Sequence, residues 1–205
     1  LSATVKYPTS HSGVRDYTEF QSQLLERWLT TDEVVDQYLV HYKTGEPIPD
    51  SLIEKINNAA TFNEGFKTTE YMASAIMDLL YHTTDPAKID PDSFEREQLK
   101  AIGMPEEIVM RHRTTQFGHI FSGEGYSSGY YGYMWAEVLT ADAAEAFEEA
   151  PGGYYDEEVS DRLVKYLFSI RNAMDPAEAY RKFRGRDAKV EALMRDRGFP
   201  VKSDK

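Results

Sequence analysis

Residues 117–139 contain the side chains best suited to chemistry. From His119 to Tyr133, just ahead of Trp135, it places one histidine, four glycines and four tyrosines. Glycine permits backbone conformations with positive φ, and a tyrosine hydroxyl can donate a hydrogen bond to a carbonyl oxygen or an oxyanion. A segment that moves and carries such donors is typical of a loop that closes over a substrate. The composition therefore favours a substrate lid over a segment that only packs in the core.

The spacing of the tyrosines allows a second interpretation. At about 100° per residue, one stripe of a helix would hold Tyr126, Tyr130, Tyr133 and Glu137. The opposite side, the expected core face, would hold Tyr131, Trp135 and Val138. An amphipathic helix with tyrosines at its boundary explains this pattern without any catalytic role. The glycines argue against it, because glycine weakens a helix.

Single histidines give little support for a metal site. The chain has five, namely His11, His41, His82, His112 and His119, and it contains no HExxH motif. An isolated histidine is more often a surface or core residue, and two histidines do not complete a zinc site. His119 is the exception, because it leads directly into the glycine–tyrosine segment.

A pair of glutamates in residues 15–28 is the third candidate. Glu19 and Glu26 are seven residues apart, so they share one face of a helix. Glu19 is flanked by Tyr17 and Phe20, and a carboxylate buried there would need a cation or a metal as partner. Spacing alone favours the simpler interpretation, in which both glutamates are solvated.

Helical periodicity and capping residues recur along the chain and define the elements that position these candidates. Core-facing residues of a first helix, within 15–29, are Phe20, Leu24, Leu25 and Trp28. A later repeat at helical spacing comprises Met72, Ile76, Leu79 and Leu80. The expected helix starts are Thr31 or Asp32, Ser51, Asp92, Pro105, Asp175 and Asp187, and the expected ends are Gly45, Gly103 and Gly198.

We find no convincing buried strand in the sequence. The chain is therefore predicted to be all-α, an irregular multi-helix bundle in a single domain over residues 1–205. Residues 15–205 are expected to be helical and residues 1–14 to form a loop or a strand. The 41% hydrophobic and 13% aromatic content is enough for a buried core.

Composition argues against several classes of protein. The net charge of -12, from 35 acidic and 23 basic side chains, disfavours binding to nucleic acid or to an anionic membrane. The absence of cysteine excludes disulfides and thiolate catalysis, and it fits a reducing compartment. We find no run of 18 apolar residues and no signal peptide, so we expect a cytoplasmic protein that does not span a membrane.

Four segments together resemble the thimet oligopeptidase family of zinc metallopeptidases. They are RDYTEFQSQLLERW at 15–28, FNEGF at 62–66, FGHIFSGEGYSSGYYGYMWAEVLTADA at 117–143 and YRKFRGRDA at 180–188. Within that family the similarity is greatest to the dipeptidyl carboxypeptidase (peptidyl-dipeptidase) branch. The segments span most of the chain, in the order and at distances that fit the family.

The resemblance implies a role for each candidate residue. Glu19 matches the third ligand of a catalytic Zn²⁺, and Glu26 matches a residue of the same helix that would support the ligands. The residues that would bind substrate and stabilise the oxyanion are His119, Tyr126, Tyr130 and Tyr133. The hinges of the closing loop would be Gly123, Gly125 and Gly129. The implied substrates are short peptides.

The chain also departs from the family pattern. Gln21 stands where the family usually has proline, Glu124 resembles an insertion, and the loop at 10–14 is shorter than usual. The HExxH helix, which supplies two zinc ligands and the general base, should precede Leu1. We therefore expect the chain to be the C-terminal portion of a peptidase catalytic domain. Without its N-terminal part, this fragment is expected to lack zinc and activity.

Two questions stay open at the level of sequence. The chain could instead be a free-standing, non-catalytic helical module that binds peptides. The sequence also does not distinguish release of C-terminal dipeptides from internal cleavage. Candidates for holding a substrate's C-terminal carboxylate are Arg111, Arg113, Arg184 and Arg186, with internal salt bridges as the simpler explanation.

Overall fold

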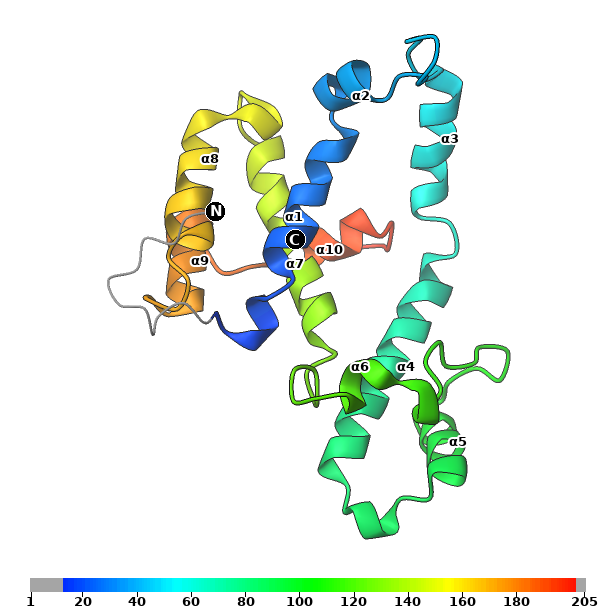
Figure 1. Ribbon diagram of the computed structural model, residues 1–205. Coiled ribbons are helices and arrows are strands. Elements are labelled where there is room, and N and C mark those ends of the chain that lie inside the picture. The colour runs from blue at the N-terminus through cyan, green and yellow to red at the C-terminus, as the bar shows by residue number, and fades with distance from the viewer. Residues whose placement is uncertain (1–12, 202–205) are drawn as a thin grey trace. The chain divides into compact units, whose positions relative to one another are not determined.

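Helices dominate the computed structural model, which describes residues 13–201 (Figure 1). Over this range there is no β-strand, and Val40 and Pro47 form one isolated antiparallel bridge. The all-α prediction is confirmed. The predicted loop or strand at 1–14 falls almost entirely on residues 1–12, outside the described range. The helices are α1 Phe20–Glu26, α2 Asp32–Tyr38, α3 Asp50–Ala60, α4 Glu64–Thr83, α5 Pro91–Ala101, α6 Gly118–Phe121, α7 Gly132–Glu148, α8 Glu157–Leu163, α9 Pro176–Arg184 and α10 Val190–Asp196.

The chain forms two compact units. The first comprises the described residues up to Phe62 and from Met134 onward, and the second comprises Asn63–Tyr133. The prediction of a single domain over residues 1–205 stays a prediction. None of the helices in the described part of the chain is long and apolar enough to cross a membrane.

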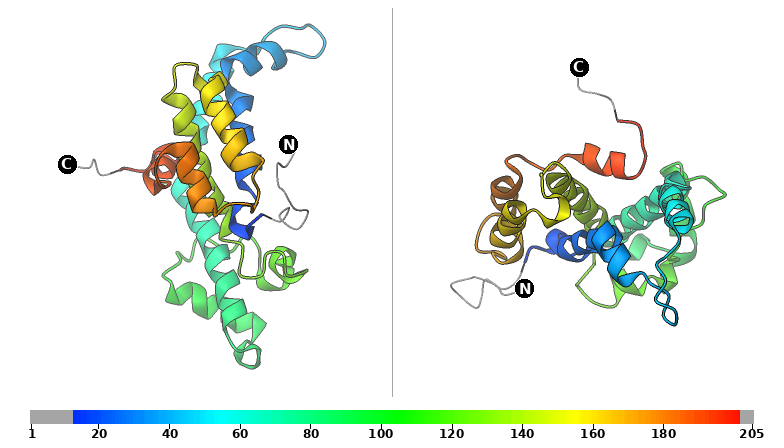
Figure 2. Two further views of the ribbon diagram at one scale, coloured as in Figure 1. Left: turned by 90° about the vertical axis from the view of Figure 1, so that its left-hand side faces the viewer. Right: turned by 90° about the horizontal axis from the view of Figure 1, so that it is seen from above.

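The core of the first unit is built from α1, α7, α8 and α9. Phe20 and Leu24 of α1 and Phe147 of α7 are fully buried in it. The Trp28 ring packs edge-on against Phe147 at 5.1 Å, and its Nε1 donates to the carbonyl oxygen of Tyr154 at 2.9 Å. Figure 2 shows α8 beside α9, which is part of the same core. Burial of these aromatic rings fixes α1 in place.

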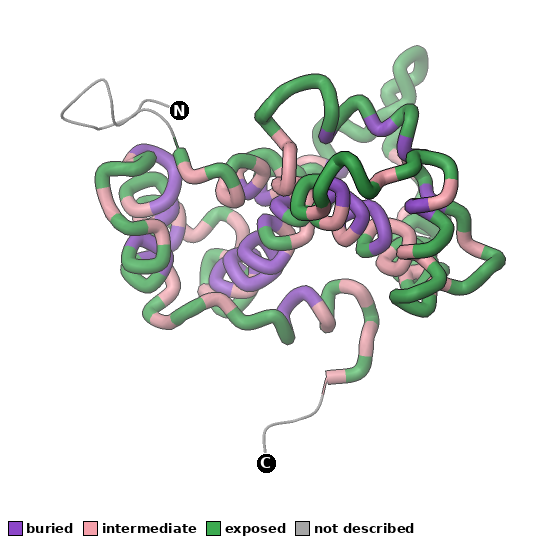
Figure 3. The backbone as a smooth tube through the Cα atoms, turned by 90° about the horizontal axis from the view of Figure 1, so that it is seen from below, coloured by how far each residue is buried: buried purple, intermediate pink, exposed green. Residues whose placement is uncertain are grey.

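The core of the second unit lies between α4, α5 and residues 110–120. Its buried members include Met77 and Tyr81 of α4, Phe94 of α5, and Phe117 and Ile120. Buried and exposed positions recur in turn along the backbone of the described residues, as expected for helices that each bury one side (Figure 3). The repeat at Met72–Leu80 is confirmed as part of one long helix, α4.

The first helix differs in detail from its prediction. It is interrupted, with 3₁₀ turns at Arg15–Tyr17 and Arg27–Thr30 on either side of α1. Phe20 and Leu24 are buried and Trp28 is partly buried, as expected. The assignment of Leu25 to the core face is wrong, because its side chain is 49% exposed. At 100° per residue, Leu25 follows Leu24 around the helix and leaves the face that packs on α7.

Proline and local hydrogen bonds decide where several helices start. The predicted cap Asp92 is wrong, because Pro91 takes the first helical position and Asp90 caps α5 instead. Oδ1 of Asp90 accepts from the N–H groups of residues 92 and 93, both at 3.0 Å. Ser51 lies inside α3 rather than at its start. Thr31 occupies the N-cap position of α2 as expected.

Glycine predicted two helix ends correctly and one wrongly. Gly103 and Gly198 follow α5 and α10 with φ of 74° and 71°, the left-handed conformation that ends helices. Gly45 also has positive φ, but α2 has already ended at Tyr38. Gly45 instead lies in the turn between the bridged residues of the Val40–Pro47 pair. The helix expected after Pro105 is absent, since residues 105–113 form turns, bends and irregular chain.

Asp175, which was predicted to start a helix, occupies the N-cap position of α9, and its contribution to stability can be measured. Oδ1 of Asp175 accepts from the N–H of Glu178 at 2.9 Å, and Pro176 follows at the first helical position. We expect Asp175→Ala to cost about 1 kcal/mol of stability and to lower Tm by about 3 °C. Thermal unfolding followed by circular dichroism measures this loss.

Asp187 provides the matched control. Sequence reasoning makes it a cap, but α10 is preceded by Lys189, and Asp187 pairs with Arg181 at 2.7 Å on the surface. We expect Asp187→Ala to leave Tm nearly unchanged. A larger loss for Asp187→Ala than for Asp175→Ala would contradict these cap assignments.

Candidate active site

The glycine–tyrosine segment is not a helix over most of its length. Residues 122–131 form bends and turns between α6 and α7, so the alternative interpretation, a helical stripe of tyrosines, is wrong. Tyr131 and Trp135, expected in the core, are both 43% exposed, whereas Val138 is buried as expected. Three glycines precede α7 within this stretch, and each lowers the stability of a helix there. Helix α7 begins only at Gly132.

The turns nevertheless bring the predicted site residues together in the second unit. The rings of His119 and Tyr126 lie 4.2 Å apart between centroids. Tyr126 stacks on Tyr133 at 5.5 Å with an angle of 6°, and Tyr130 meets Tyr133 edge-on at 5.4 Å. We call His119, Tyr126, Tyr130 and Tyr133 the tyrosine cluster. These four residues were predicted to act together, and they share one surface.

Hydrogen bonds connect three members of the tyrosine cluster. Nε2 of His119 lies 2.9 Å from the Tyr133 hydroxyl, which donates to the Tyr126 hydroxyl at 3.1 Å. Because the Tyr133 proton is directed at Tyr126, Nε2 of His119 is the donor in the first contact. A connected chain of polar groups polarises its members and strengthens each bond. The arrangement orients hydroxyl donors at the surface of the unit.

Burial and nearby charges shift the pKa values of Tyr130 and His112, and these shifts decide the protonation states of both side chains. Burial raises the pKa of Tyr130, and the nearby Tyr133 hydroxyl raises it further. Tyr130 is therefore a protonated donor at neutral pH. Burial, followed by the charge of Arg111, lowers the pKa of His112, whose ring stacks on Phe117 at 4.8 Å. His112 is therefore largely neutral at pH 7.

Sequence reasoning missed a residue that shapes this segment. Asp78 of α4 is 0% exposed, and its carboxylate accepts from the backbone N–H groups of Ser128 and Tyr130, both at 2.9 Å. The available signal was an aspartate within the apolar run of residues 75–80. A buried carboxylate requires such donors.

Glu19 lies in the first unit, at the N-cap position of α1. It is half-buried rather than buried, while Phe20 beside it is fully enclosed and anchors the helix. The Ser22 hydroxyl lies 2.9 Å from the Glu19 carbonyl oxygen and 3.4 Å from its Oε2. Glu26 lies at the other end of α1 and is exposed. Across residues 13–201, no three His, Cys, Asp or Glu side chains gather as a metal site.

Three of the four arginine candidates have carboxylate partners. Arg184 forms a bidentate pair with Glu149 at 2.6 and 2.8 Å. Nη1 of Arg186 lies 2.6 Å from buried Asp142. These contacts favour salt bridges over substrate binding. For Arg113 the partner is Glu95 at 2.7 Å. Arg111 is exposed, and its charge acts on His112 and Tyr130, so it stays a candidate for binding a carboxylate.

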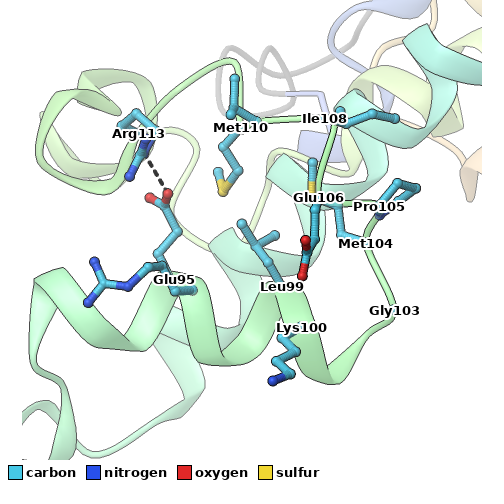
Figure 4. Close-up of a pocket in the computed structure, with 12 residues that line it drawn as sticks. Glu95, Leu99, Lys100, Gly103, Met104, Pro105, Glu106, Ile108, Met110 and Arg113 are labelled. Carbon is cyan, nitrogen blue, oxygen red and sulfur yellow. Dashed lines mark ion pairs between the residues drawn. The ribbon is translucent and has the colours of Figure 1, made fainter.

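A cavity of about 500 Å³ opens between α5 and residues 103–113 of the second unit. Its apolar wall includes Leu99, Met104 and Met110, and the Glu95–Arg113 ion pair lies at its edge (Figure 4). None of the tyrosine cluster lines this cavity. The cavity and the cluster are therefore separate features of the unit.

Comparison with known proteins identifies the family. Residues 2–199 match the model of Peptidase family M3. The chain is 35% identical over 190 residues to dipeptidyl carboxypeptidase of Escherichia coli, covering 91% of this chain and 28% of that protein. It is 31% identical over 186 residues to oligopeptidase A of Haemophilus influenzae, covering 90% of this chain and 27% of that protein.

A plant oligopeptidase is similar to the chain over the same share of its length. The chain is 33% identical over 194 residues to a probable cytosolic oligopeptidase A of Arabidopsis thaliana, with 90% of this chain and 27% of that protein covered. The chain thus spans little more than a quarter of the length of these relatives. The match covers nearly all of the present chain, including the segments that carry Glu19 and the tyrosine cluster. The chain belongs to Peptidase family M3.

Proposed function

We propose that this chain forms part of the active site of a zinc-dependent peptidase that hydrolyses short peptides. The observation that carries the proposal is the hydrogen-bonded chain of His119, Tyr133 and Tyr126. Family membership supports peptide hydrolysis as the reaction. Hydroxyl donors held at fixed positions are suited to an oxyanion that forms when water attacks a peptide carbonyl.

Glu19 is proposed to supply one ligand to the metal. Catalytic zinc sites use three protein ligands, and the 205 residues contain no HExxH. Two further ligands and the general base would therefore come from residues outside this chain. The Glu19 carboxylate fits such a role, because it is only partly buried and the Ser22 hydroxyl approaches Oε2 at 3.4 Å. When bound, zinc polarises the substrate carbonyl and activates water.

The residues of this chain would act on the substrate by donating and orienting hydrogen bonds. Tyr126 donates to the developing oxyanion, or Tyr133 does so after its proton turns from Tyr126 to the substrate, while Nε2 of His119 holds the Tyr133 hydroxyl oxygen at 2.9 Å. Tyr130 packs edge-on against Tyr133 and stays protonated, because burial raises its pKa. Each contact restricts the orientation of a donor before substrate arrives.

The proposal predicts different behaviour for this chain alone and for the longest natural polypeptide that contains it. The longer protein is expected to hold about one zinc ion and to cleave short peptides. The chain alone, with one ligand, is expected to retain no zinc after dialysis and to show no hydrolysis. Metal analysis by mass spectrometry and chromatography of peptide products measure both. Stable zinc binding or hydrolysis by the chain alone would contradict the proposal.

A second candidate is a non-catalytic helical module that binds peptides. The tyrosine cluster favours it in one respect, because the cluster forms within the second unit, whereas the proposed zinc ligand Glu19 belongs to the first. The same experiment separates the two functions. Peptide binding without hydrolysis by the longest natural polypeptide would support the module.

The finer assignment to a peptidyl-dipeptidase rests on the relatives and on the motifs of residues 117–143. Product analysis on a peptide of eight to ten residues tests it. A peptidyl-dipeptidase releases dipeptides successively from the C-terminus, whereas an oligopeptidase cleaves internally.

Arg111 is the residue of this chain that we propose to bind the C-terminal carboxylate of the substrate. A cytoplasmic location belongs to the same proposal.

A further inference from the structure

The second unit contains a buried carboxylate, Asp78 of α4, whose role the proposed function does not include. The Asp78 side chain is 0% exposed, although it lies in a helix whose other buried members are mainly apolar. A buried carboxylate is unfavourable unless donors replace its lost water. The identity of those donors indicates what Asp78 does.

The donors to Asp78 come chiefly from the loop that carries the tyrosines. Oδ1 accepts from the Ser128 N–H and Oδ2 accepts from the Tyr130 N–H, both at 2.9 Å. Nδ1 of His82, one turn along α4, lies 2.9 Å from Oδ1 on the helix side. The two carboxylate oxygens therefore hold two backbone groups that are two residues apart. They constrain the path of the chain between them.

The backbone conformation of the loop agrees with such a constraint. Ser128 has a φ of 56°, a left-handed conformation that residues other than glycine rarely adopt. Gly129 lies between the two held N–H groups, and its own N–H donates to the Tyr126 carbonyl oxygen at 2.9 Å. The stretch of residues 126–130 is thus tied both to α4 and to itself.

A second side chain of α4 holds the same residue. The Tyr71 hydroxyl donates to the carbonyl oxygen of Tyr130, and the two rings stack at 5.5 Å. Tyr71 and Asp78 are seven residues apart, so they lie on one face of α4 two turns apart. Both backbone polar groups of Tyr130 are therefore bound by this helix. Tyr130 in turn packs on Tyr133 at 5.4 Å.

We propose that Asp78 is a positioning residue for the tyrosine cluster. It fixes the backbone of Ser128 and Tyr130 on α4, so that Tyr130 and Tyr133 keep their positions. Loop closure is then confined to the residues before Ser128, where Gly123 and Gly125 lie, and Gly129 is not a hinge. The consequence for catalysis rests on the proposed function, whereas the consequence for loop motion does not.

The test is Asp78→Asn in the longest natural polypeptide that contains this chain. The substitution keeps the side-chain shape, but the amide nitrogen cannot accept, so one loop N–H loses its acceptor. We expect amide hydrogen exchange in residues 126–131 to accelerate about tenfold or more. We also expect kcat for peptide hydrolysis to fall about 10- to 100-fold with KM changed less than about twofold.

Asp142→Asn is the matched control. Asp142 of α7 is also 0% exposed, and it accepts from the Tyr180 hydroxyl at 2.7 Å and from Arg186 at 2.6 Å in the first unit. The same chemical change there is expected to lower Tm without altering exchange in residues 126–131 or kcat. Comparison with this variant removes the effect of general destabilisation.

A milder variant covers the case in which Asp78→Asn does not fold. Tyr71→Phe removes only the hydroxyl that binds the Tyr130 carbonyl, and it is expected to change exchange and kcat in the same direction by a smaller factor. Wild-type exchange in residues 126–131 of both variants would overturn the positioning role. Faster exchange with unchanged kcat would overturn its catalytic consequence. If the single Phe variants of Tyr126, Tyr130 and Tyr133 also leave kcat unchanged, the proposed oxyanion role fails instead, and the exchange measurement still decides the role of Asp78.

Discussion

Replacing Glu19 with glutamine is expected to remove zinc from the longest natural polypeptide that contains this chain and to abolish peptide hydrolysis. Glutamine keeps the size of the side chain but presents a neutral amide in place of a carboxylate. A site with three protein ligands then loses one of them. Loss of a supporting residue around a metal typically costs about 10- to 100-fold in affinity or activity. Loss of a ligand should cost more than that.

Variants of two other glutamates, Glu26 and Glu33, show whether the loss of zinc is specific to Glu19. Glu26→Gln alters the residue at the far end of α1 and should lower zinc affinity by about 10- to 100-fold. Glu33→Gln changes an exposed side chain of α2 and should have no effect. Zinc content after dialysis and kcat/KM are measured for all three. A Glu19→Gln protein with full zinc and wild-type activity would exclude Glu19 as a ligand.

Removing the hydroxyl of Tyr126 or Tyr133 is the change with the second-largest expected effect. We expect Tyr→Phe at the residue that donates to the oxyanion to lower kcat by about 10²- to 10³-fold. KM should change little, because this hydrogen bond strengthens only as the transition state forms. Tyr42→Phe, which removes a hydroxyl from an exposed residue of the first unit, serves as control.

Coupling between the two tyrosines adds a second test. Because Tyr133 donates to Tyr126 at 3.1 Å, the two hydroxyls share one hydrogen bond and should not act independently. The double variant should therefore lose about as much kcat as the worse single variant. Unchanged kcat in the single Phe variants of Tyr126, Tyr130 and Tyr133 would contradict the oxyanion role of the cluster.

The fold could be predicted from the sequence where the signal is local. Asp175 followed by proline defined the start of α9, because an N-cap and its first turn interact within four residues. Asp92 was predicted to cap α5, but Asp90 does so. The two aspartates flank Pro91, and the proline takes the first helical position. The four residues of the tyrosine cluster were grouped from the sequence, and turns rather than the alternative helix bring their side chains together.

Asp78 shows what local reasoning misses. Its partners, Ser128 and Tyr130, lie 50 and 52 residues further along the chain. A sequence shows that an aspartate interrupts an apolar run, but not which distant N–H groups will satisfy it. The partners of two arginine candidates are distant in the same way, because Arg184 meets Glu149 across 35 residues and Arg186 meets Asp142 across 44.

A crystal structure of the zinc-containing polypeptide with a phosphinic peptide bound tests the central claim most directly. The phosphinyl group stands in for the tetrahedral oxyanion of peptide hydrolysis. We predict a zinc ion about 2.0–2.2 Å from a Glu19 carboxylate oxygen, with the Tyr126 or Tyr133 hydroxyl about 2.6–3.0 Å from a phosphinyl oxygen. Zinc bound without Glu19, or a phosphinyl group that neither tyrosine hydroxyl reaches, would contradict it.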